Sequence, residues 1–153
     1  LSNLNKIFEK MIFKRVSNFI ENNDCLYSLQ FGFRAKYSTT HALISITEKI
    51  RNALDQNKVA CGIFVDLQKA FDTVNREILW DILWDCGVRG KMWRVLRSLF
   101  TGFRGRVKAQ GSLSPFFEIL QGVIQGSRLG PLLFNIFFKS LIDKIKKMKG
   151  AEF

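Results

Sequence analysis

The run Val59-Ala-Cys-Gly-Ile-Phe-Val65 constrains the fold of this chain most, because it is apolar or small throughout and is followed at once by Asp66 and Leu67. Apolar runs of this length, bounded by polar residues, are typical of strands buried on both faces of a sheet. We therefore predict a strand over residues 59–67. A carboxylate at the carboxyl end of such a strand lies at the crevice where α/β sheets bind ligands, so Asp66 is the first candidate for chemistry.

Helical periodicity accounts for most of the remaining sequence. Apolar side chains recur every three or four residues in four further segments, and a fifth, short helix follows a glycine turn at residues 86–90. Two apolar stretches joined around Gly111-Ser112 predict a β-hairpin over residues 104–121. The order helix, helix, strand, helices, hairpin, helix indicates an α+β fold, with helices packed on a small sheet. The first expected helix covers residues 4–20, and the second starts at Ser38-Thr39-Thr40 and ends at Gln56-Asn57. The third is capped by Thr73 or Asn75, the fourth covers residues 91–100, and the last is opened by Pro131.

Charge is distributed unevenly along the 153 residues, whose net charge is +11. Residues 1–88 hold 11 basic and 10 acidic side chains, whereas residues 89–153 hold 13 basic and 3 acidic ones. Such asymmetry favours a polyanion as partner, and the aromatic residues among the basic ones favour nucleic acid over an acidic membrane surface or a merely solvated face. Lys91, Arg94 and Arg97 recur every third residue and share a helix face, and Arg104 and Arg106 follow. No apolar stretch is long enough to span a membrane, so we expect no membrane partner.

Three further groups of residues could take part in catalysis or ligand binding. Asp72 lies six residues after Asp66, near a helix start, where capping is the expected role and metal binding the alternative. The stretch Gln121–Pro131 holds three glycines before a helix, which suits close approach of backbone to a phosphate but equally suits a tight turn. Arg34, just after Gly32, offers donors for a phosphate or is a surface arginine beside a turn. The lone histidine, His41, lies at a predicted helix start, where we expect a structural role rather than a place in a Ser-His-Asp arrangement.

Taken together, three segments resemble the reverse transcriptase domain of non-LTR (LINE-type) retrotransposons. They are Gln30-Phe-Gly-Phe-Arg34 with Ser38-Thr39, then Phe64-Val-Asp-Leu-Gln-Lys-Ala-Phe-Asp-Thr-Val74, then Gly122-Val-Ile-Gln-Gly-Ser-Arg-Leu-Gly-Pro-Leu-Leu-Phe134. The resemblance runs from about Asn5 to Phe138. Group II intron maturases are related, but the sequence motifs of the last two segments favour LINE-type elements.

The resemblance implies a partial right-hand polymerase, with fingers and an incomplete palm over residues 4–138 and a basic helical tail over 139–153. It implies an RNA template, a DNA primer and dNTP as partners, and two Mg²⁺ ions, or Mn²⁺, as cofactors. The roles that it implies are metal binding and catalysis by Asp66, with the backbone carbonyl of Leu67; dNTP binding by Arg34, Phe71 and Gln125; template and primer binding by Gly126, Ser127, Arg94, Arg97, Arg104 and Arg106; and structural roles for Asp72, Gly32 and Pro131.

Departures from the family pattern bear on activity. Ile124 stands where the family usually has proline, and Arg128 where it usually has an aliphatic residue. The hairpin with paired aspartates that supplies a second metal-binding carboxylate has no match, since Asp143 lies among lysines, and no thumb follows. We therefore expect a fragment of a longer protein that lacks polymerase activity alone. The alternatives are a remnant that only binds nucleic acid and a truncated product that aggregates.

The compartment is expected from the cysteines and from the resemblance. Cys25, Cys61 and Cys86 are scattered, with no paired spacing that would indicate a disulfide framework or a zinc site. A reducing, intracellular location follows, and the family resemblance implies the cytoplasm and the nucleus.

Overall fold

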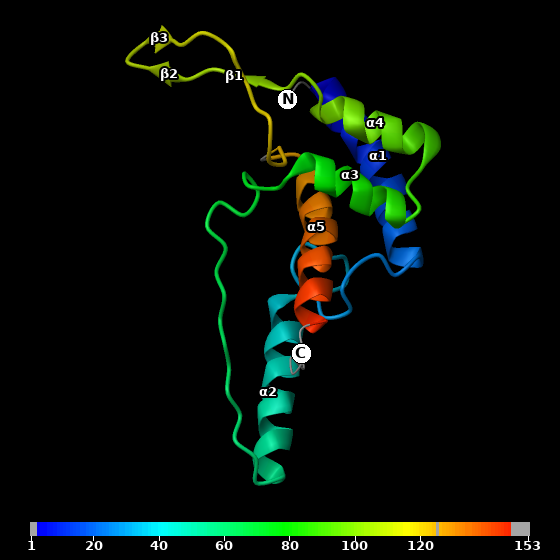
Figure 1. Ribbon diagram of the computed structural model, residues 1–153, viewed down its shortest axis with the longest axis vertical. Helices are drawn as coiled ribbons and strands as arrows, with labels where there is room; N and C mark the ends of the chain where they lie inside the picture. Colours follow the sequence, from blue (N-terminus) through cyan, green and yellow to red (C-terminus); the bar gives the residue numbers. More distant parts are fainter. Residues whose placement is uncertain (1–2, 125, 148–153) are drawn as a thin grey trace.

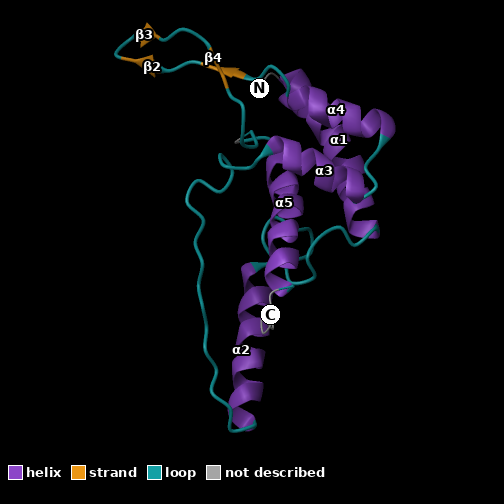
Figure 2. Ribbon diagram, viewed as in Figure 1, coloured by secondary structure: helices purple, strands orange, loops and turns teal. Residues whose placement is uncertain are grey.

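A computed structural model describes residues 3–124 and 126–147 of the chain, and it is mostly helical (Figures 1 and 2). Five helices and four two-residue strands follow one another in these residues. The strands form two antiparallel ladders, β1 with β4 and β2 with β3. The elements are α1 (Asn3–Asn22), α2 (Thr39–Asp55), α3 (Arg76–Asp85), α4 (Gly90–Phe100), β1 (Arg104–Gly105), β2 (Lys108–Ala109), β3 (Ser112–Leu113), β4 (Phe117–Glu118) and α5 (Leu129–Lys146).

The core lies where α1, α3, α4 and α5 meet, and α3 is its centre because it packs on both α4 and α5. A stripe at helical spacing makes α3 suitable for this place: Leu79, Trp80 and Leu83 are all buried. Facing them, α5 contributes Leu129, Leu133 and Ile136, each with no exposed surface. Full burial of each such side chain stabilises the fold by roughly 1.5–3 kcal/mol, so this cluster holds the helical body together.

Local capping signals place the helix ends where the sequence predicts them. The Ser38 hydroxyl accepts a hydrogen bond from the His41 backbone N–H at the start of α2, and Asn75 does the same for Ile78 at the start of α3. Pro131 lies in the first turn of α5, as predicted. The helix α5 continues through Lys139, the first residue of the predicted basic helical tail, to Lys146.

The predicted strand over 59–67 is wrong. Those residues form no ladder, and Val59, Ile63 and Phe64 are 95%, 88% and 93% exposed. The segment is instead an extended connection that runs from the far end of α2 back to the helical body (Figure 1). A strand needs a partner to satisfy its backbone groups, and among the described residues β1 pairs only with β4 and β2 only with β3. The helices therefore pack on one another rather than on a central sheet.

Helix α2 is also more exposed than its sequence predicts. The expected inward face of Leu43, Ile46, Ile50 and Leu54 is 45–65% exposed, and no residue of α2 is buried. Within the described part of the chain, α2 packs against no other helix or strand. Its apolar stripe is present, but nothing covers it.

The predicted hairpin exists as an arm over residues 103–121 that extends away from the helices (Figure 2). Its ladders pair Arg104 with Glu118 and Lys108 with Leu113, and the turn lies at Gln110-Gly111. None of the described helices is long and apolar enough to cross a membrane.

Candidate active site

Asp66 and Leu67 lie in the extended segment, both exposed to solvent. Among the residues that the structure describes, no group of three or more His, Cys, Asp or Glu side chains is placed to hold a metal ion. Mg²⁺ is commonly held by one or two carboxylates together with water and substrate phosphates, so Asp66 fits as one ligand. A single carboxylate does not complete a two-metal site, so Asp66 needs further ligands before it can take part in two-metal chemistry.

Aromatic stacking joins the three segments that carry the family resemblance. The ring of Phe71 stacks on Phe134 of α5, with centroids 4.8 Å apart, and meets Phe33 edge-on at 5.9 Å. Phe134 stacks in turn on Phe138 at 5.8 Å. Residues that are 38 and 63 positions from Phe71 in the sequence thus meet at one ring, and Phe71 has a fixed place beside the start of α5.

Backbone hydrogen bonds hold the segment after Asp66 against the glycine-rich loop. The N–H of Val123 donates to Phe71 O at 2.9 Å, and that of Gly122 donates to Val74 O at 2.8 Å. Gly122 has φ +85°, and a Cβ there would lie 2.8 Å from the carbonyl oxygen of Asp72. Only glycine allows this approach, which explains the residue that opens the third segment.

A pocket of about 400 Å³ opens where these segments meet, lined by Phe71, Ile124, Gly126, Ser127, Arg128 and Pro131. Four of the predicted site residues, Phe71, Gly126, Ser127 and Pro131, therefore converge. Gln125 lies outside the described residues. Both departures from the family pattern, Ile124 and Arg128, also line this pocket.

Ser127 faces the interior of the molecule rather than the pocket mouth. It is 5% exposed; its hydroxyl donates to Glu9 Oε1 at 3.0 Å and accepts from the backbone N–H of Leu129 at 3.1 Å. The other oxygen of Glu9 accepts from the Arg128 backbone N–H at 3.3 Å. A carboxylate at this point also suits the positive end of α5. Glu9 thus fixes the end of the glycine-rich loop, a role that the sequence did not reveal.

Arg34 is bound within the protein. Its guanidinium donates to both carboxylate oxygens of Glu21, lies 4.5 Å over the Tyr37 ring, and its side chain is 12% exposed. Hydrogen bonding to Glu21 raises the pKa of Arg34. Gly32 beside it accepts a bond of 2.9 Å from the buried amide of Asn135. Hydrogen bonds therefore connect this segment to both α1 and α5.

Asp72 lies in the turn that precedes α3, and its backbone N–H donates to Lys69 O at 2.9 Å. The N-cap of α3 is Asn75, three residues further on, whose side chain accepts a hydrogen bond from the Ile78 N–H.

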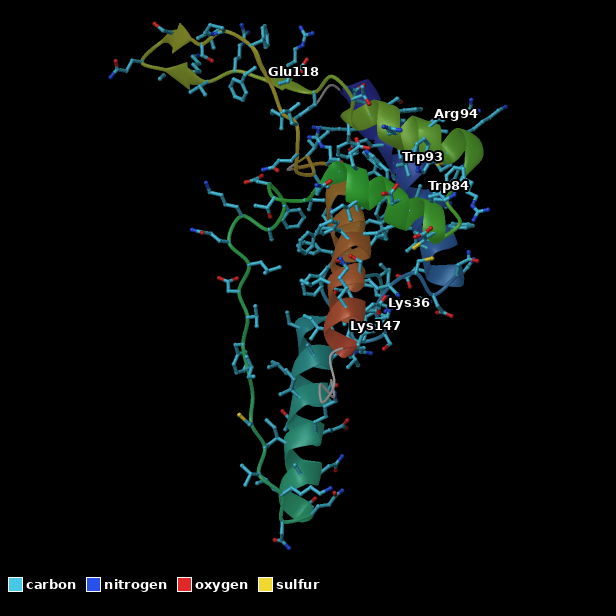
Figure 3. All side chains as sticks on the ribbon, in the orientation of Figure 1. Lys36, Trp84, Trp93, Arg94, Glu118 and Lys147 are labelled. Carbon is cyan, nitrogen blue, oxygen red and sulfur yellow. The ribbon has the colours of Figure 1, made fainter. Side chains whose placement is uncertain are left out.

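The predicted nucleic-acid-binding arginines occupy two separate surfaces. Arg94 and Arg97 are exposed on α4, and Arg97 lies 5.2 Å over the Trp93 ring and 3.4 Å from Glu77. Figure 3 places Arg94, Trp93 and Trp84 on the side of the helical body away from the extended segment. Arg104 and Arg106 are exposed on the arm. Neither pair lines the pocket beside Phe71.

Arg76 is the main residue that sequence reasoning missed. It is buried, and its guanidinium donates to four carbonyl oxygens, those of Gly122 (2.8 Å), Phe100 (3.1 Å), Ile119 (2.7 Å) and Gln121 (3.1 Å). Burial lowers the pKa of this guanidinium. A signal did exist: Arg76 continues the apolar stripe of α3 by one turn, at the spacing 76, 79, 80, 83.

Comparison with known proteins decides the family. A family model described as reverse transcriptase (RNA-dependent DNA polymerase) matches residues 1–152. The chain belongs to the reverse transcriptase family. Among relatives, this reverse transcriptase domain is 32% identical over 149 residues to a probable RNA-directed DNA polymerase from transposon BS of Drosophila melanogaster. It is 31% identical over 145 residues to the RNA-directed DNA polymerase from mobile element jockey of Drosophila funebris.

The aligned regions cover 92% and 90% of this reverse transcriptase chain but only 16% and 15% of those two relatives. The domain is thus related to those of jockey-like non-LTR retrotransposons and spans about a sixth of the length of the relatives it matches. Reverse transcriptases generally use divalent metal ions. No solved structure matches the chain.

Proposed function

We propose that this chain forms the fingers and the first part of the palm of a retrotransposon polymerase that copies RNA into DNA. The reaction is attack of a primer 3′-hydroxyl on the α-phosphate of a dNTP, which forms a phosphodiester and releases pyrophosphate. The observation that carries the proposal is the convergence of the segments around Phe71 and Gly126 at one pocket, because these segments hold the strings typical of the family. The chain acts within a longer polymerase, since its relatives are about six times its length.

Each site residue has a proposed role. Phe71 lies beneath the sugar of the incoming nucleotide and excludes a 2′-hydroxyl. Its stacking on Phe134 supports this role, because the stack restrains the Phe71 ring from moving away from the sugar. Gln125 and Gly126 pack against the nascent base pair. Asp66, with the carbonyl of Leu67, contributes one ligand set to Mg²⁺, and a second carboxylate comes from outside the described residues. Ser127 is buried, so its proposed contact with the template is made by its backbone rather than by its side chain.

Arg34 requires a rearrangement to reach a triphosphate. Its bonds to Glu21 would have to be exchanged for bonds to phosphate, and a bidentate pair of this kind gives up two charge-assisted hydrogen bonds. Its proposed dNTP contact therefore requires that the ion pair with Glu21 break first. We assign the phosphates of the primer and template instead to exposed arginines, which include Arg94 and Arg97 on α4.

A second candidate function is nucleic-acid binding without catalysis. The specific observation in its favour is the basic charge of residues 89–153, which hold 13 basic and 3 acidic side chains. Such a remnant would bind a primer–template in EDTA as well as in Mg²⁺.

Primer extension separates the two functions. The assay uses an RNA template, a labelled DNA primer and dNTP, with this chain and with the longer reading frame that contains it. We expect binding but no extension by the chain alone, and extension by the longer protein that Asp66→Asn abolishes. Asp81→Asn is the matched control, an exposed aspartate on α3. Extension that survives Asp66→Asn would contradict the catalytic role, and binding without extension by the longer protein would favour the remnant.

A further inference from the structure

The arm of residues 103–121 is an exposed antiparallel ribbon that the pocket beside Phe71 does not use. No residue of the arm is buried, and five large apolar side chains on it are 50–79% exposed: Val107, Leu113, Phe116, Phe117 and Leu120. It projects from the helical body on the side opposite the outer face of α4 (Figure 1). A ribbon this exposed contributes little to the core, so its sequence is free to serve a binding partner.

Hydrogen bonds hold both ends of the arm to the helical body, although the arm itself is exposed. Arg76 of α3 donates to Phe100 O before the arm and to Ile119 O and Gln121 O at its end. The N–H of Ile119 donates to Phe103 O at 2.8 Å, which closes the base of the ribbon. Because one buried guanidinium holds both ends, the direction of the arm is set by α3.

One face of the arm is basic. Arg104, Arg106 and Lys108 alternate along the first half of the hairpin, and alternate residues of an extended chain share a face. All three are exposed, and no carboxylate of a described residue forms an ion pair with them. Glu118, the one acidic residue of the arm, is labelled in Figure 3 and lies opposite Arg104 in the register of β1 and β4. The face therefore presents a surplus of unneutralised cations.

Arg106 is held in place for binding. Its guanidinium lies 4.9 Å from the centroid of the Phe116 ring. Stacking of this kind restrains a long side chain while its N–H donors remain available to a phosphate or to the edge of a guanine.

The shape of the arm selects among polyanions. A two-stranded ribbon fits the major groove of B-form DNA, which is about 12 Å wide, whereas the major groove of A-form RNA is deep and narrow and does not admit one. We propose that the arm binds duplex DNA of B form by entering its major groove, with Arg104, Arg106 and Lys108 directed at the phosphates and base edges. The inference rests on the proposed function only in taking nucleic acid as the partner, and it assigns Arg104 and Arg106 to duplex DNA in place of the template and primer.

Fluorescence anisotropy tests the partner. The probes are a short DNA duplex, an RNA duplex of the same sequence and the single DNA strand, each titrated with the whole chain in EDTA over a range of salt concentrations. The test variant is Arg104→Gln/Arg106→Gln/Lys108→Gln. The matched control is Lys6→Gln/Lys10→Gln/Lys14→Gln, which removes the same charge from exposed positions of α1. Circular dichroism checks that both variants keep the helical fold.

We expect the wild type to prefer the DNA duplex, and the arm variant to lose most of that affinity. Each phosphate contact adds about 0.9 to the slope of log affinity against log salt, so the arm variant should lose up to about 2.7 of slope and the control much less. Phe116→Leu should weaken binding about two- to fivefold through loss of the stack on Arg106. Guanine N7 atoms of the bound duplex should be protected from dimethyl sulfate by the wild type and not by the arm variant.

The opposing outcomes are distinct. Equal DNA binding by the arm variant and the wild type overturns the inference and leaves the proposed polymerase intact. Equal affinity for RNA and DNA duplexes, unprotected N7 atoms, or displacement of DNA by vesicles of anionic lipid would each overturn the groove assignment. If the wild type binds none of the nucleic acids in a salt-dependent way, the nucleic-acid part of the proposed function fails as well.

Discussion

Replacing Arg76 by methionine tests whether this buried side chain stabilises the fold. The substitution keeps much of the side-chain volume but removes all donors to the carbonyl oxygens of Phe100, Ile119, Gln121 and Gly122. Two of these bonds, to Gly122 and Phe100, are buried, and a buried carbonyl left unpaired costs about 1–3 kcal/mol. The other two are partly accessible, so water can replace the lost donor at small cost.

Two effects oppose each other at this position. Burial of the guanidinium costs free energy, which is the reason that the pKa of Arg76 is lowered, and methionine removes that cost. Four carbonyl partners, with donor–acceptor distances of 2.7–3.1 Å, outweigh it. We expect Arg76→Met to reduce the free energy of unfolding by about 2–5 kcal/mol, a large part of the 5–15 kcal/mol typical of small domains. Arg76→Lys should fall between the two, since it keeps the charge but not the fork of donors.

Urea unfolding followed by tryptophan fluorescence measures this loss, because Trp80 is 3% exposed and should report on exposure of the core. Arg94→Met is the control, since Arg94 is exposed on α4, and it should change the free energy by less than about 0.5 kcal/mol. If Arg76→Met were as stable as the wild type, or more so, the buried charge would be a burden and the reasoning about the carbonyl set would be refuted.

Three further predictions follow from the structure. Gly122→Ala should cost about 2–4 kcal/mol in urea unfolding, since its Cβ would overlap Asp72 O at 2.8 Å, while Gly102→Ala, with a positive φ but open space, should cost about 1 kcal/mol. Glu9→Ala should cost about 1–3 kcal/mol, and a double-mutant cycle with Ser127→Ala should show coupling; simple additivity would argue against the contact. Burial raises the pKa of the Cys86 thiol to about 12, so the thiol stabilises the fold below pH 9 and this contribution falls as pH rises from about 9 to 12. Cys86→Ala should flatten the fall of stability with pH over that range, and parallel profiles would rule the thiol out.

Locally encoded features of the fold follow from the sequence. Ser38 and Asn75 cap α2 and α3 because a short polar side chain satisfies the free N–H groups of the first turn, whatever the rest of the chain does. The hairpin follows from two apolar stretches around a glycine turn. The site residues that converge, Phe71 and Gly126 among them, are predicted from the resemblance of their sequence motifs to those of the family.

Features that depend on distant partners do not follow from the sequence. The run 59–65 has the composition of a strand, but composition does not supply a neighbouring strand. The contacts Arg76 to Ile119, Glu9 to Ser127 and Arg34 to Glu21 join residues whose proximity only the fold creates. The sequence alone therefore does not show that a charge is buried or paired, as Arg34 is with Glu21.

The exposure of α2 has a consequence for local stability. A helix of 17 residues that packs on no other element is only marginally stable in water, and its free energy of opening is set by its own hydrogen bonds and caps. Amide hydrogens of α2 should therefore exchange with solvent through local opening, whereas those of α3 and α5 should exchange only when the whole body unfolds. Because Asp66 follows α2 on an unpaired segment, its carboxylate gains a fixed position only when something pairs with residues 59–67.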